Sequence, residues 1–376
     1  MILKKLKIKD FRSYKDLELE FSPGGGVFSG SNAAGKTNIL DAIYFLAFLH
    51  SRRASKDEES IRWGEPGFYL MGEIERSEEF FHRIEVSVYR DCTKKLKINS
   101  KIKTKFPSAE EGLKVVAFYP DDFSLISSTP LSRRRFLNVE ISQIDAPYRL
   151  FLRQYQEILN QRNTALKRIR NKRCGIDELS PWGKQLIDVG IKIIKKRMDL
   201  VEEMSHTLKE IHNFLTDGRE CLKLQYICSL GNGNEKPVLL KGLEDKFRQS
   251  LLSLQAKEVA LGMTLSGPHR DDIVFFINDI NASIYGSHAQ QRTMAVSLRL
   301  AWAQLMTKIL EEPPVVLLDD VLSELDGKRR TMLLDFLQSH KMQCFITGTS
   351  AQQFKNNLKK VDFFEVSGGT INKTAI

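Results

Sequence analysis

A short segment near the start of the chain has glycine, lysine and threonine at the spacing that phosphate binding requires. Its residues are Gly30, Ser31, Asn32, Ala33, Ala34, Gly35, Lys36 and Thr37, with Asn38 directly after them. Glycines at both ends let the backbone curve so that its N–H groups point at phosphate oxygens. The lysine of this pattern reaches the β- and γ-phosphates, and the hydroxyl beside it holds Mg²⁺. The segment, Asn38 included, is therefore predicted to bind a nucleoside triphosphate, with Lys36 also assisting catalysis and Thr37 holding the metal.

Two adjacent carboxylates follow a wholly apolar stretch near the end of the chain. Residues 315–318 are Val-Val-Leu-Leu, and Asp319 and Asp320 come directly after them. A strand buried on both faces has this composition, and open α/β sheets bind ligands at the carboxyl ends of their strands. Asp319 is expected to hold Mg²⁺, and Asp320 to polarise the attacking water. Apolar strands often end in Asp, but the pairing with the glycine-bounded loop makes ATP and Mg²⁺ the predicted cofactors.

The elements around both motifs are those of an α/β protein. A short strand over 27–29 leads into the glycine-bounded loop, and a helix over 37–49 follows it. Alternating or apolar stretches predict further strands over 2–8, 17–21, 69–74, 83–89, 96–102, 344–346 and 363–366.

Helical periodicity replaces the strand patterns from about residue 130. Apolar residues recur at helical spacing over 148–166 and again over 182–215, with breaks at Cys174-Gly175 and Ser180-Pro181. Two long amphipathic helices in succession predict an antiparallel hairpin. The expected fold is a split mixed β-sheet with a phosphate-loop core and an antiparallel subdomain, interrupted by an inserted helical lobe. Its predicted parts are 1–119 (first half of the ATPase head), 120–221 (helical lobe) and 222–376 (second half of the head).

Two further segments resemble parts of ABC-type ATPases. Residues 285–293, which enter a helix predicted over 294–310, resemble the ABC signature, whose serine-led helix N-terminus faces the γ-phosphate held by a second subunit. Ser287, Ala289 and Gln290 are the expected signature residues, acting across an ATP-dependent homodimer. The segment after Asp320 resembles the D-loop and supplies Ser323 and Asp326.

The overall charge favours a polyanionic partner. Lys and Arg outnumber Asp and Glu by 57 to 47, which gives a net charge of +10 and favours nucleic acid or an acidic membrane surface. The 5 cysteines are scattered, which argues against a disulfide framework or a zinc site. The longest apolar stretch, 39–49, is too short to span a bilayer, so a cytoplasmic protein is expected. The candidate DNA contacts, for which a solvated helix face is the alternative, are Arg133, Arg134, Arg135, Arg162, Lys167, Arg168 and Arg170.

Several stretches together resemble the RecF family, which is similar to SMC heads but lacks their long coiled coil. They are residues 8–14, 35–44, 119–122, 133–137, 161–163 and 267–272. The resemblance covers essentially the whole chain and places Arg12 near the nucleotide. It implies a nucleoid-associated protein that dimerises on ATP and binds single-strand/double-strand junctions or gapped duplex. With RecR and RecO, such a protein helps RecA load at gaps in DNA repair, replication restart, homologous recombination and the SOS response.

Three positions depart from the pattern that the resemblance implies. Ala33 and Ala289 stand where glycine is expected, and Asp320 stands where most ABC ATPases have Glu. Ala33 lies at a variable position of the general motif and is expected to be tolerated. Ala289 is expected to be strained at a positive φ and to weaken ATP-dependent dimerisation. The shorter carboxylate of Asp320 predicts a slow, switch-like ATPase.

Two other functions stay open on the sequence alone. The first is the energising ATPase subunit of a membrane transporter, which the helical insertion and Thr347-Gly348-Thr349, where transporters have a histidine, argue against. The second is a scaffold that uses ATP only to hold a dimer without hydrolysing it, which Ala289 and Asp320 keep open.

Overall fold

The chain is divided between two compact units. The computed structural model describes residues 1–77, 80–104, 107, 111–230, 242–354, 358 and 360–374. One unit is formed by Met1–Asp122 together with Trp302–Ile376, and the other by Phe123–Ala301. The second unit begins near residue 120, where the helical lobe is predicted to begin, but it continues past residue 221 to residue 301.

An antiparallel sheet forms one layer of the first unit, in the strand order β2-β1-β4-β5-β6-β7. Leu6 and Ile8 of β1 lie opposite Leu19 and Leu17 of β2, so apolar residues share one face. This alternation is the pattern of a sheet with one buried and one solvated face. The strands are β1 (Ile2–Phe11), β2 (Tyr14–Glu20), β4 (Gly67–Ser77), β5 (Phe80–Tyr89), β6 (Lys94–Ile98) and β7 (Lys101–Lys103).

A second sheet, mostly parallel, has the order β15-β14-β3-β13-β12-β8. Only β15 pairs antiparallel, at one edge. All five residues of β12 are buried, as expected of a parallel strand covered on both faces. The strands are β3 (Gly25–Ser29), β8 (Val115–Phe118), β12 (Val315–Asp319), β13 (Cys344–Gly348), β14 (Asp362–Ser367) and β15 (Thr370–Thr374).

Helix α1 (Lys36–Phe48) is the central helix of the first unit. It packs against strands of both sheets, and every residue from Ile39 to Phe48 is buried. A helix covered on all sides needs apolar residues around its whole circumference rather than on one stripe, which explains its composition. The unit is completed by α8 (Gly327–Ser339) and the short helices η1 (Asp57–Ser60), η2 (Pro120–Ser124, which reaches the second unit), η4 (Val321–Glu324) and η5 (Ala351–Gln353).

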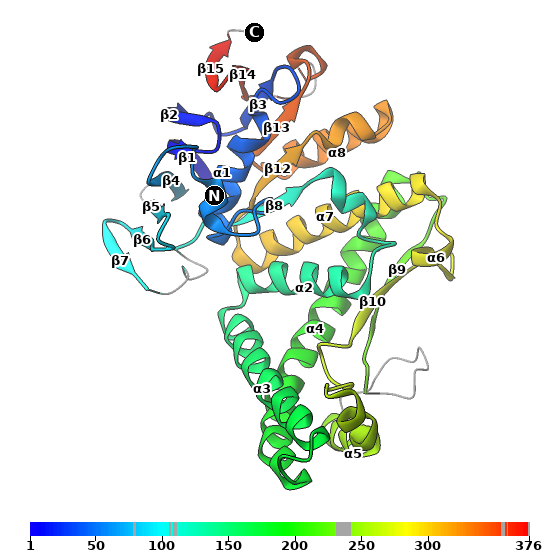
Figure 1. Ribbon diagram of the computed structural model, residues 1–376. Helices are drawn as coiled ribbons and strands as arrows, with labels where there is room; N and C mark the ends of the chain where they lie inside the picture. Colours follow the sequence, from blue (N-terminus) through cyan, green and yellow to red (C-terminus); the bar gives the residue numbers. More distant parts are fainter. Residues whose placement is uncertain are drawn as a thin grey trace. The chain divides into compact units, whose positions relative to one another are not determined.

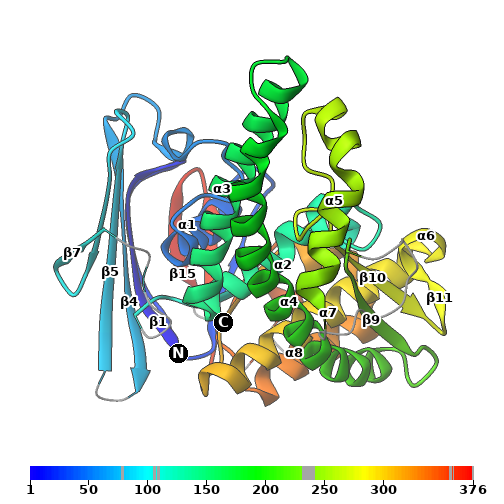
Figure 2. The ribbon, with the colours of Figure 1, turned by 90° about the horizontal axis from the view of Figure 1, so that it is seen from below.

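The second unit is built around the predicted helical hairpin. Helices α3 (Ala146–Arg170) and α4 (Leu179–Leu215) run side by side, as Figure 1 and Figure 2 both show. The other elements are α2 (Pro130–Ile144), η3 (Ile176–Glu178), β9 (Leu222–Ile227), α5 (Leu243–Leu261), β10 (Asp272–Ile277), β11 (Ile280–Asn281), α6 (Ala282–Tyr285) and α7 (His288–Leu310), whose last residues belong to the first unit.

The fold class is confirmed, and the helices differ from the prediction in three respects. Pro181 lies inside the first turn of α4 rather than in a break, because first-turn N–H groups have no intrahelical acceptor and their loss costs little. Helix α7 begins at His288 rather than at residue 294, and α2 is a distinct helix. None of the helices in the described part of the chain has the length and apolar character that crossing a bilayer requires.

Candidate functional site

The glycine-bounded loop connects β3 to α1, and close packing explains both of its fixed glycines. A Cβ atom on Gly30 would lie 2.3 Å from the carbonyl oxygen of Val366. Gly35 has φ +110°, and a Cβ there would lie 2.9 Å from the Ser13 hydroxyl and 3.0 Å from that of Tyr14. The loop therefore fits between strand β14 and the segment after β1 only without side chains at these two positions.

Lys36 and the start of α1 supply a positively charged end to this loop. The Lys36 side chain is almost buried, and its Nζ donates to the carbonyl oxygens of Gly30 and Ser31, at 2.8 Å each. Helix α1 has no side-chain cap at its N-terminus and no acidic residue in its first turn. Its first N–H groups therefore have no side-chain acceptor within the helix, and together with the lysine they fit an anion such as a triphosphate.

The predicted magnesium ligands meet at the carboxyl end of β12. The Thr37 hydroxyl donates to Asp319 Oδ1 at 2.9 Å, and Asp319 is buried. Burial raises the pKa of Asp319, while hydrogen bonds from the hydroxyls of Thr347 and Thr37 lower it. A hydroxyl and one carboxylate suit Mg²⁺, which prefers oxygen ligands and takes the rest from phosphates and water. The described residues contain no group of three or more His, Cys, Asp or Glu side chains able to hold a metal.

Thr347 is a site residue that the sequence interpretation missed. Its hydroxyl donates to Asp319 Oδ1 at 2.8 Å and accepts the Asp320 N–H at 2.9 Å, so it holds both carboxylate residues. Asp319 and Thr347 are direct partners in the parallel pairing of β12 with β13. Their common position at the ends of neighbouring strands was the available signal, but the sequence does not show that β12 and β13 are adjacent.

Asp320 and the D-loop turn away from the strand direction at once. Asp320 is exposed and has φ +53°, a left-handed conformation that Asp tolerates better than most residues. Ser323 donates to the Asp320 carbonyl oxygen at 2.6 Å. Asp326 caps α8 by accepting the Arg329 N–H at 2.9 Å. The structure thus gives both D-loop residues local roles in ending β12 and starting α8.

Arg12 and Asn38 make protein contacts beside the loop. The Arg12 guanidinium donates to Asp41 at 3.2 Å and to Ser51 at 3.0 Å. Asp41 is buried in α1 and needs this opposite charge, because an unpaired buried carboxylate is costly. The Asn38 amide donates to the Ser13 hydroxyl at 2.9 Å. In this structure the Arg12 guanidinium holds α1 through Asp41. The ATP contact expected of Arg12 stays a prediction.

The two alanines that replace expected glycines have opposite backbone conformations. Ala33 has φ +64°, a conformation in which a Cβ atom is unfavourable. Ala289 is the second residue of α7 and has helical backbone. The expectation of a positive φ at Ala289 is therefore wrong, because helix α7 begins earlier than predicted. That Ala33 is tolerated and that Ala289 weakens dimerisation both stay predictions.

The signature residues form the N-terminus of α7. Gln290 N–H donates to the Ser287 hydroxyl at 3.3 Å, and Ser287 N–H donates to the Gln290 side-chain oxygen at 3.0 Å. This reciprocal pair is a capping box, which satisfies two N–H groups that a helix start leaves without partners. Ser287 and Ala289 are exposed, and Gln290 is partly buried.

Two of the predicted DNA contacts are instead buried ion-pair partners. Arg133 forms a two-point ion pair with Asp272. Arg162 donates to Glu258 at 2.6 Å and to Thr264 at 2.7 Å. Both arginines are at most 6% exposed. Their heads hold elements of the second unit together, which corrects the expectation that they contact phosphates.

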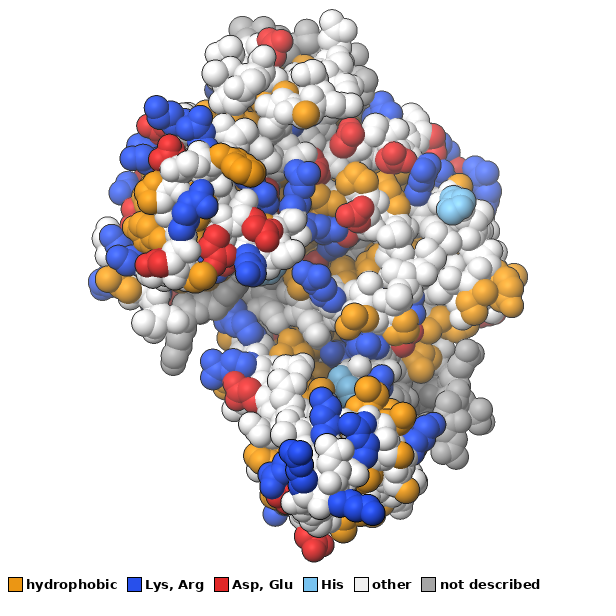
Figure 3. All heavy atoms as spheres, viewed as in Figure 1, with side chains coloured by type: hydrophobic (Ala, Val, Ile, Leu, Met, Phe, Trp, Pro, Cys, Tyr) orange, Lys and Arg blue, Asp and Glu red, His pale blue; other side chains and the backbone are white. Residues whose placement is uncertain are grey.

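The other candidate cations differ in how accessible they are. The half-buried Arg134 donates to the carbonyl oxygen of Asp271 at 2.6 Å. Figure 3 shows Lys and Arg side chains gathered over the lower part of the view, where the hairpin lies, with few acidic ones among them. The exposed candidates are Arg135, Lys167, Arg168 and Arg170, of which Arg168 pairs with Glu178 at 3.1 Å. The DNA contacts of these four residues stay a prediction.

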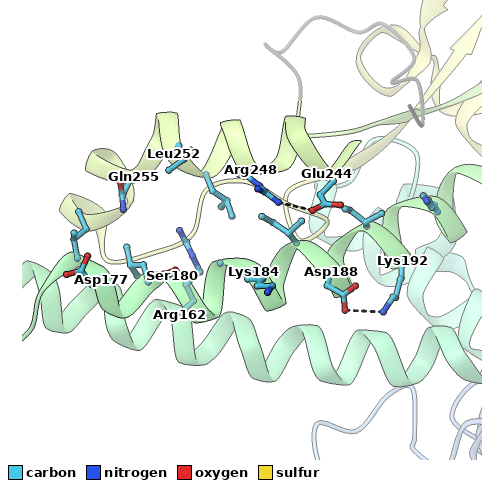
Figure 4. A pocket seen from close by; sticks show the side chains of 17 residues that line it. Arg162, Asp177, Ser180, Lys184, Asp188, Lys192, Glu244, Arg248, Leu252 and Gln255 are labelled. Atoms are coloured by element: carbon cyan, nitrogen blue, oxygen red, sulfur yellow. Dashed lines mark hydrogen bonds and ion pairs between the residues drawn. The ribbon is translucent and has the colours of Figure 1, made fainter. Parts of the chain in front are cut away.

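A pocket lies between α4 and α5 in the second unit, and Arg162 is among its lining residues (Figure 4). Its lining carries charges of both signs, and two pairs of them contact each other. Lys192 pairs with Asp188 at 3.1 Å, and Arg248 pairs with Glu244 at 2.8 Å. The carboxylates Asp177, Asp188 and Glu244 in the lining lower the attraction of the pocket for a phosphate backbone.

Comparisons with known proteins agree over the full length. Residues 2–372 match the family model described as the RecF/RecN/SMC N terminal domain. The chain is 39% identical to the DNA replication and repair protein RecF of Ligilactobacillus salivarius over 383 residues, which cover 99% of this chain and 98% of that protein. It is 38% identical to RecF of Listeria monocytogenes over 377 residues, which cover 100% of both.

Solved structures give the same answer. The chain is similar to the recombination mediator protein RecF of the RecFOR pathway in its RecF-ATPrS structure, with a TM-score of 0.89, 30% identity and coverage of 100% of this chain and 98% of that one. The RecF-ATP structure gives a TM-score of 0.88 at 30% identity, covering 99% and 97%. An Smc head bound to the C-winged helix domain of ScpA gives 0.57 at 18% identity, covering 100% and 98%, which shows a shared fold alone. By sequence over its whole length and by fold, the chain belongs to the RecF family.

Proposed function

We propose that the protein is an ATP-dependent, DNA-binding recombination mediator that works as an ATP-induced dimer. The observation that carries the proposal is the nucleotide site. Lys36 is the first residue of the uncapped helix α1, directly after the glycine-bounded loop. The next residue, Thr37, contacts Asp319 at 2.9 Å. The solved RecF structures named for ATP and ATPrS support ATP as the ligand.

The proposed nucleotide chemistry uses residues already in place. Lys36 exchanges its contacts with the loop carbonyls for phosphate oxygens, and the N–H groups at the start of α1 bind the same phosphates. Thr37 and Asp319 hold Mg²⁺, which offsets the negative charge of the phosphates when bound. Asp320 orients the attacking water. Its short side chain suits slow hydrolysis that acts as a switch.

The proposed dimer needs the signature of a second copy of the chain. Ser287 and Gln290 start α7, and a helix N-terminus attracts anions such as a γ-phosphate. In the proposed domain assignment, residues 1–119 and 222–376 form the ATPase head, and residues 120–221 form the helical lobe. The signature then belongs to the head by function, although residues 287–290 lie in the second compact unit.

The proposed macromolecular partners are DNA and the other members of the pathway. The exposed cations of the hairpin suit the phosphates of gapped duplex or of junctions with single strands, and each contact would weaken with salt. RecR, RecO and, through them, RecA are the proposed protein partners at a cytoplasmic, nucleoid-associated site. The solved RecF structures named for the RecFOR pathway support this assignment.

A scaffold that binds ATP without hydrolysing it is the second candidate. It is favoured by the exposed Asp320, which is a short carboxylate for orienting water. Mg²⁺-dependent hydrolysis that is present in the wild type and lost in Asp320→Asn would reject it. The transporter alternative has no support from the family to which the chain belongs.

The test is sedimentation of the wild type and of Lys36→Met, with and without ATP, Mg²⁺ and a gapped duplex. We expect ATP to drive only the wild type into a DNA-bound dimer, because the mutant lacks the ammonium group that reaches the phosphates. Lys15→Met, at an exposed position of β2, is the matched control and should behave as the wild type. A wild type that binds ATP but stays monomeric on DNA would reject the dimer.

A further inference from the structure

Glu220 links the signature to the end of the long helix α4. Its Oε1 accepts from the side-chain amide of Gln290 at 3.0 Å, and its Oε2 lies 3.1 Å from His212 Nε2. His212 is in the last turn of α4 and is fully buried. Glu220 itself lies between α4 and β9, with 21% of its side chain exposed.

The contacts continue from His212 back to α7. His212 Nδ1 lies 2.9 Å from the Ser297 hydroxyl, which donates its proton to the Thr293 carbonyl oxygen at 2.8 Å. Because Ser297 has given away its only proton, it must accept from His212 Nδ1. A continuous chain of contacts therefore starts in the first turn of α7 and meets the same helix again about two turns later. Its members are Gln290, Glu220, His212 and Ser297.

This chain fixes the orientation of the Gln290 amide. The amide oxygen accepts the Ser287 N–H at 3.0 Å, and the amide nitrogen donates to Glu220. The Ser287 N–H selects the amide oxygen at one end and the Glu220 carboxylate selects the amide nitrogen at the other, so both contacts favour the same orientation of the amide. The Ser287 hydroxyl accepts the Gln290 N–H at 3.3 Å and so keeps its own proton for another acceptor.

We propose that Glu220 is a positioning residue for the signature. By holding the Gln290 amide nitrogen, it keeps the amide oxygen on Ser287 and leaves the Ser287 hydroxyl proton directed to an anion, which the proposed function identifies as the γ-phosphate bound by a second copy of the chain. This inference rests on the proposed ATP-dependent dimer and deepens it, because it assigns to Glu220 a role that acts through Gln290.

The principal test compares Glu220→Ala with Glu220→Gln, which keeps an oxygen acceptor for Gln290 and removes the charge. We expect Glu220→Ala to weaken ATP-dependent dimerisation about tenfold, the loss typical of one hydrogen bond to a charged group. Glu220→Gln should restore dimerisation to near the wild-type level. Binding of Mg²⁺-ATP to the isolated subunit should be unchanged in both, because its binding residues belong to the other compact unit.

A matched control and a milder variant keep the test decisive. Glu202→Ala removes an exposed carboxylate from α4 and should dimerise as the wild type. If Glu220→Ala does not fold, Glu220→Asp replaces it. The aspartate keeps the charge but is one methylene too short to reach both Gln290 and His212, so it should also weaken dimerisation. Wild-type dimerisation in Glu220→Ala, or in Glu220→Asp where that replaces it, would overturn the inference.

Failure of the proposed function would be recognised separately. If the wild type binds ATP but never dimerises, the proposed dimer fails, and the Glu220–Gln290 contact is then judged by unfolding in urea. Glu220→Ala, Gln290→Ala and the double variant form a cycle in which contacting residues give non-additive free energies of unfolding. Non-additive effects support the positioning role, whereas additive effects reject it.

Discussion

Helices α1 and α7 both offer an N-terminus to a phosphate in the proposed mechanism, but they start in different ways. Helix α1 follows a left-handed Gly35 and has no side-chain cap. Helix α7 starts with a capping box between Ser287 and Gln290, which Glu220 extends. A phosphate at α1 therefore meets N–H groups that no cap satisfies, whereas a phosphate at α7 competes with side chains. In the proposed dimer, this difference favours an order in which ATP binds α1 of one subunit before α7 of another joins the complex.

The alanines of the two regions show the same contrast. Ala33 has φ +64° in the loop before α1, while Ala289 is an ordinary helical residue in α7. Backbone strain therefore resides in the phosphate loop and not in the signature. Strain of this kind persists where the surrounding structure dictates the backbone, as the close contacts of Gly30 and Gly35 do here.

The largest expected effect concerns the carboxylate end of the α1 site. Thr347→Val removes the hydroxyl that bonds Asp319 and the Asp320 N–H, so the free energy of unfolding should fall by about 1–3 kcal/mol. Because that hydroxyl lowers the already raised pKa of Asp319, the pKa should rise further. Binding of Mg²⁺-ATP needs ionised Asp319. When the pH is lowered, the variant should therefore lose affinity for Mg²⁺-ATP at a higher pH than the wild type does. Titration with a fluorescent ATP analogue measures this shift.

Asp320→Asn supplies the opposite control for the same titration. The charge of Asp320 raises the pKa of Asp319, so its removal should move the loss of affinity to lower pH. The stability has the matching sign. The pKa of Asp319 is raised above its ordinary value of 3.8 in the folded protein. Between pH 3.8 and the raised pKa, the folded state therefore binds more protons than the unfolded chain. The contribution of Asp319 to stability falls as the pH rises through this range. Shifts of both variants in the same direction would contradict this assignment.

A smaller effect is expected at the start of α7. Ser287→Ala removes the acceptor for the Gln290 N–H and should lower the free energy of unfolding by about 1 kcal/mol. It should also remove ATP-dependent dimerisation, while Mg²⁺-ATP binding to the single subunit stays unchanged. Ser253→Ala serves as the control, since Ser253 is an exposed residue within α5. Weakened ATP binding by the isolated Ser287→Ala subunit would break the proposed separation between α1 and α7.

The smallest effects should have opposite signs. Ala33→Gly relieves a left-handed backbone and should stabilise the protein by about 1 kcal/mol or less, once the greater freedom of glycine in the unfolded chain is included. Ala289→Gly replaces a good helix former and should destabilise it by up to about 1 kcal/mol. Urea unfolding of both variants measures the difference. Equal effects at the two positions would mean that backbone strain does not distinguish them.

Local patterns in the sequence were enough for much of this site. The spacing from Gly30 to Thr37 predicted the loop, and the apolar run before Asp319 predicted a buried strand. Periodicity predicted the α3–α4 hairpin because each helix carries its own apolar stripe. The start of α7 was misplaced, since Ser287 and Gln290 were interpreted as ligand-binding residues and not also as a capping box.

Charge patterns were the least informative part of the sequence. Arg133 and Arg162 looked like the other cations of their segments, but each lies buried against a carboxylate far away in the chain, Asp272 and Glu258. Whether a cation faces DNA or an internal carboxylate depends on distant residues, which periodicity within one segment does not reveal.

The sequence by itself determined the motifs, the strands and helices that carry them, and the family. These properties depend on neighbours in the chain, through backbone geometry, side-chain periodicity and capping. Only the tertiary structure decided that Thr347 supports Asp319, that Glu220 supports Gln290, and that Ala33 rather than Ala289 has a left-handed backbone. The first two contacts join residues 28 and 70 positions apart. Pairing of strands and helices at such separations is set by packing, and packing is a property of the whole fold.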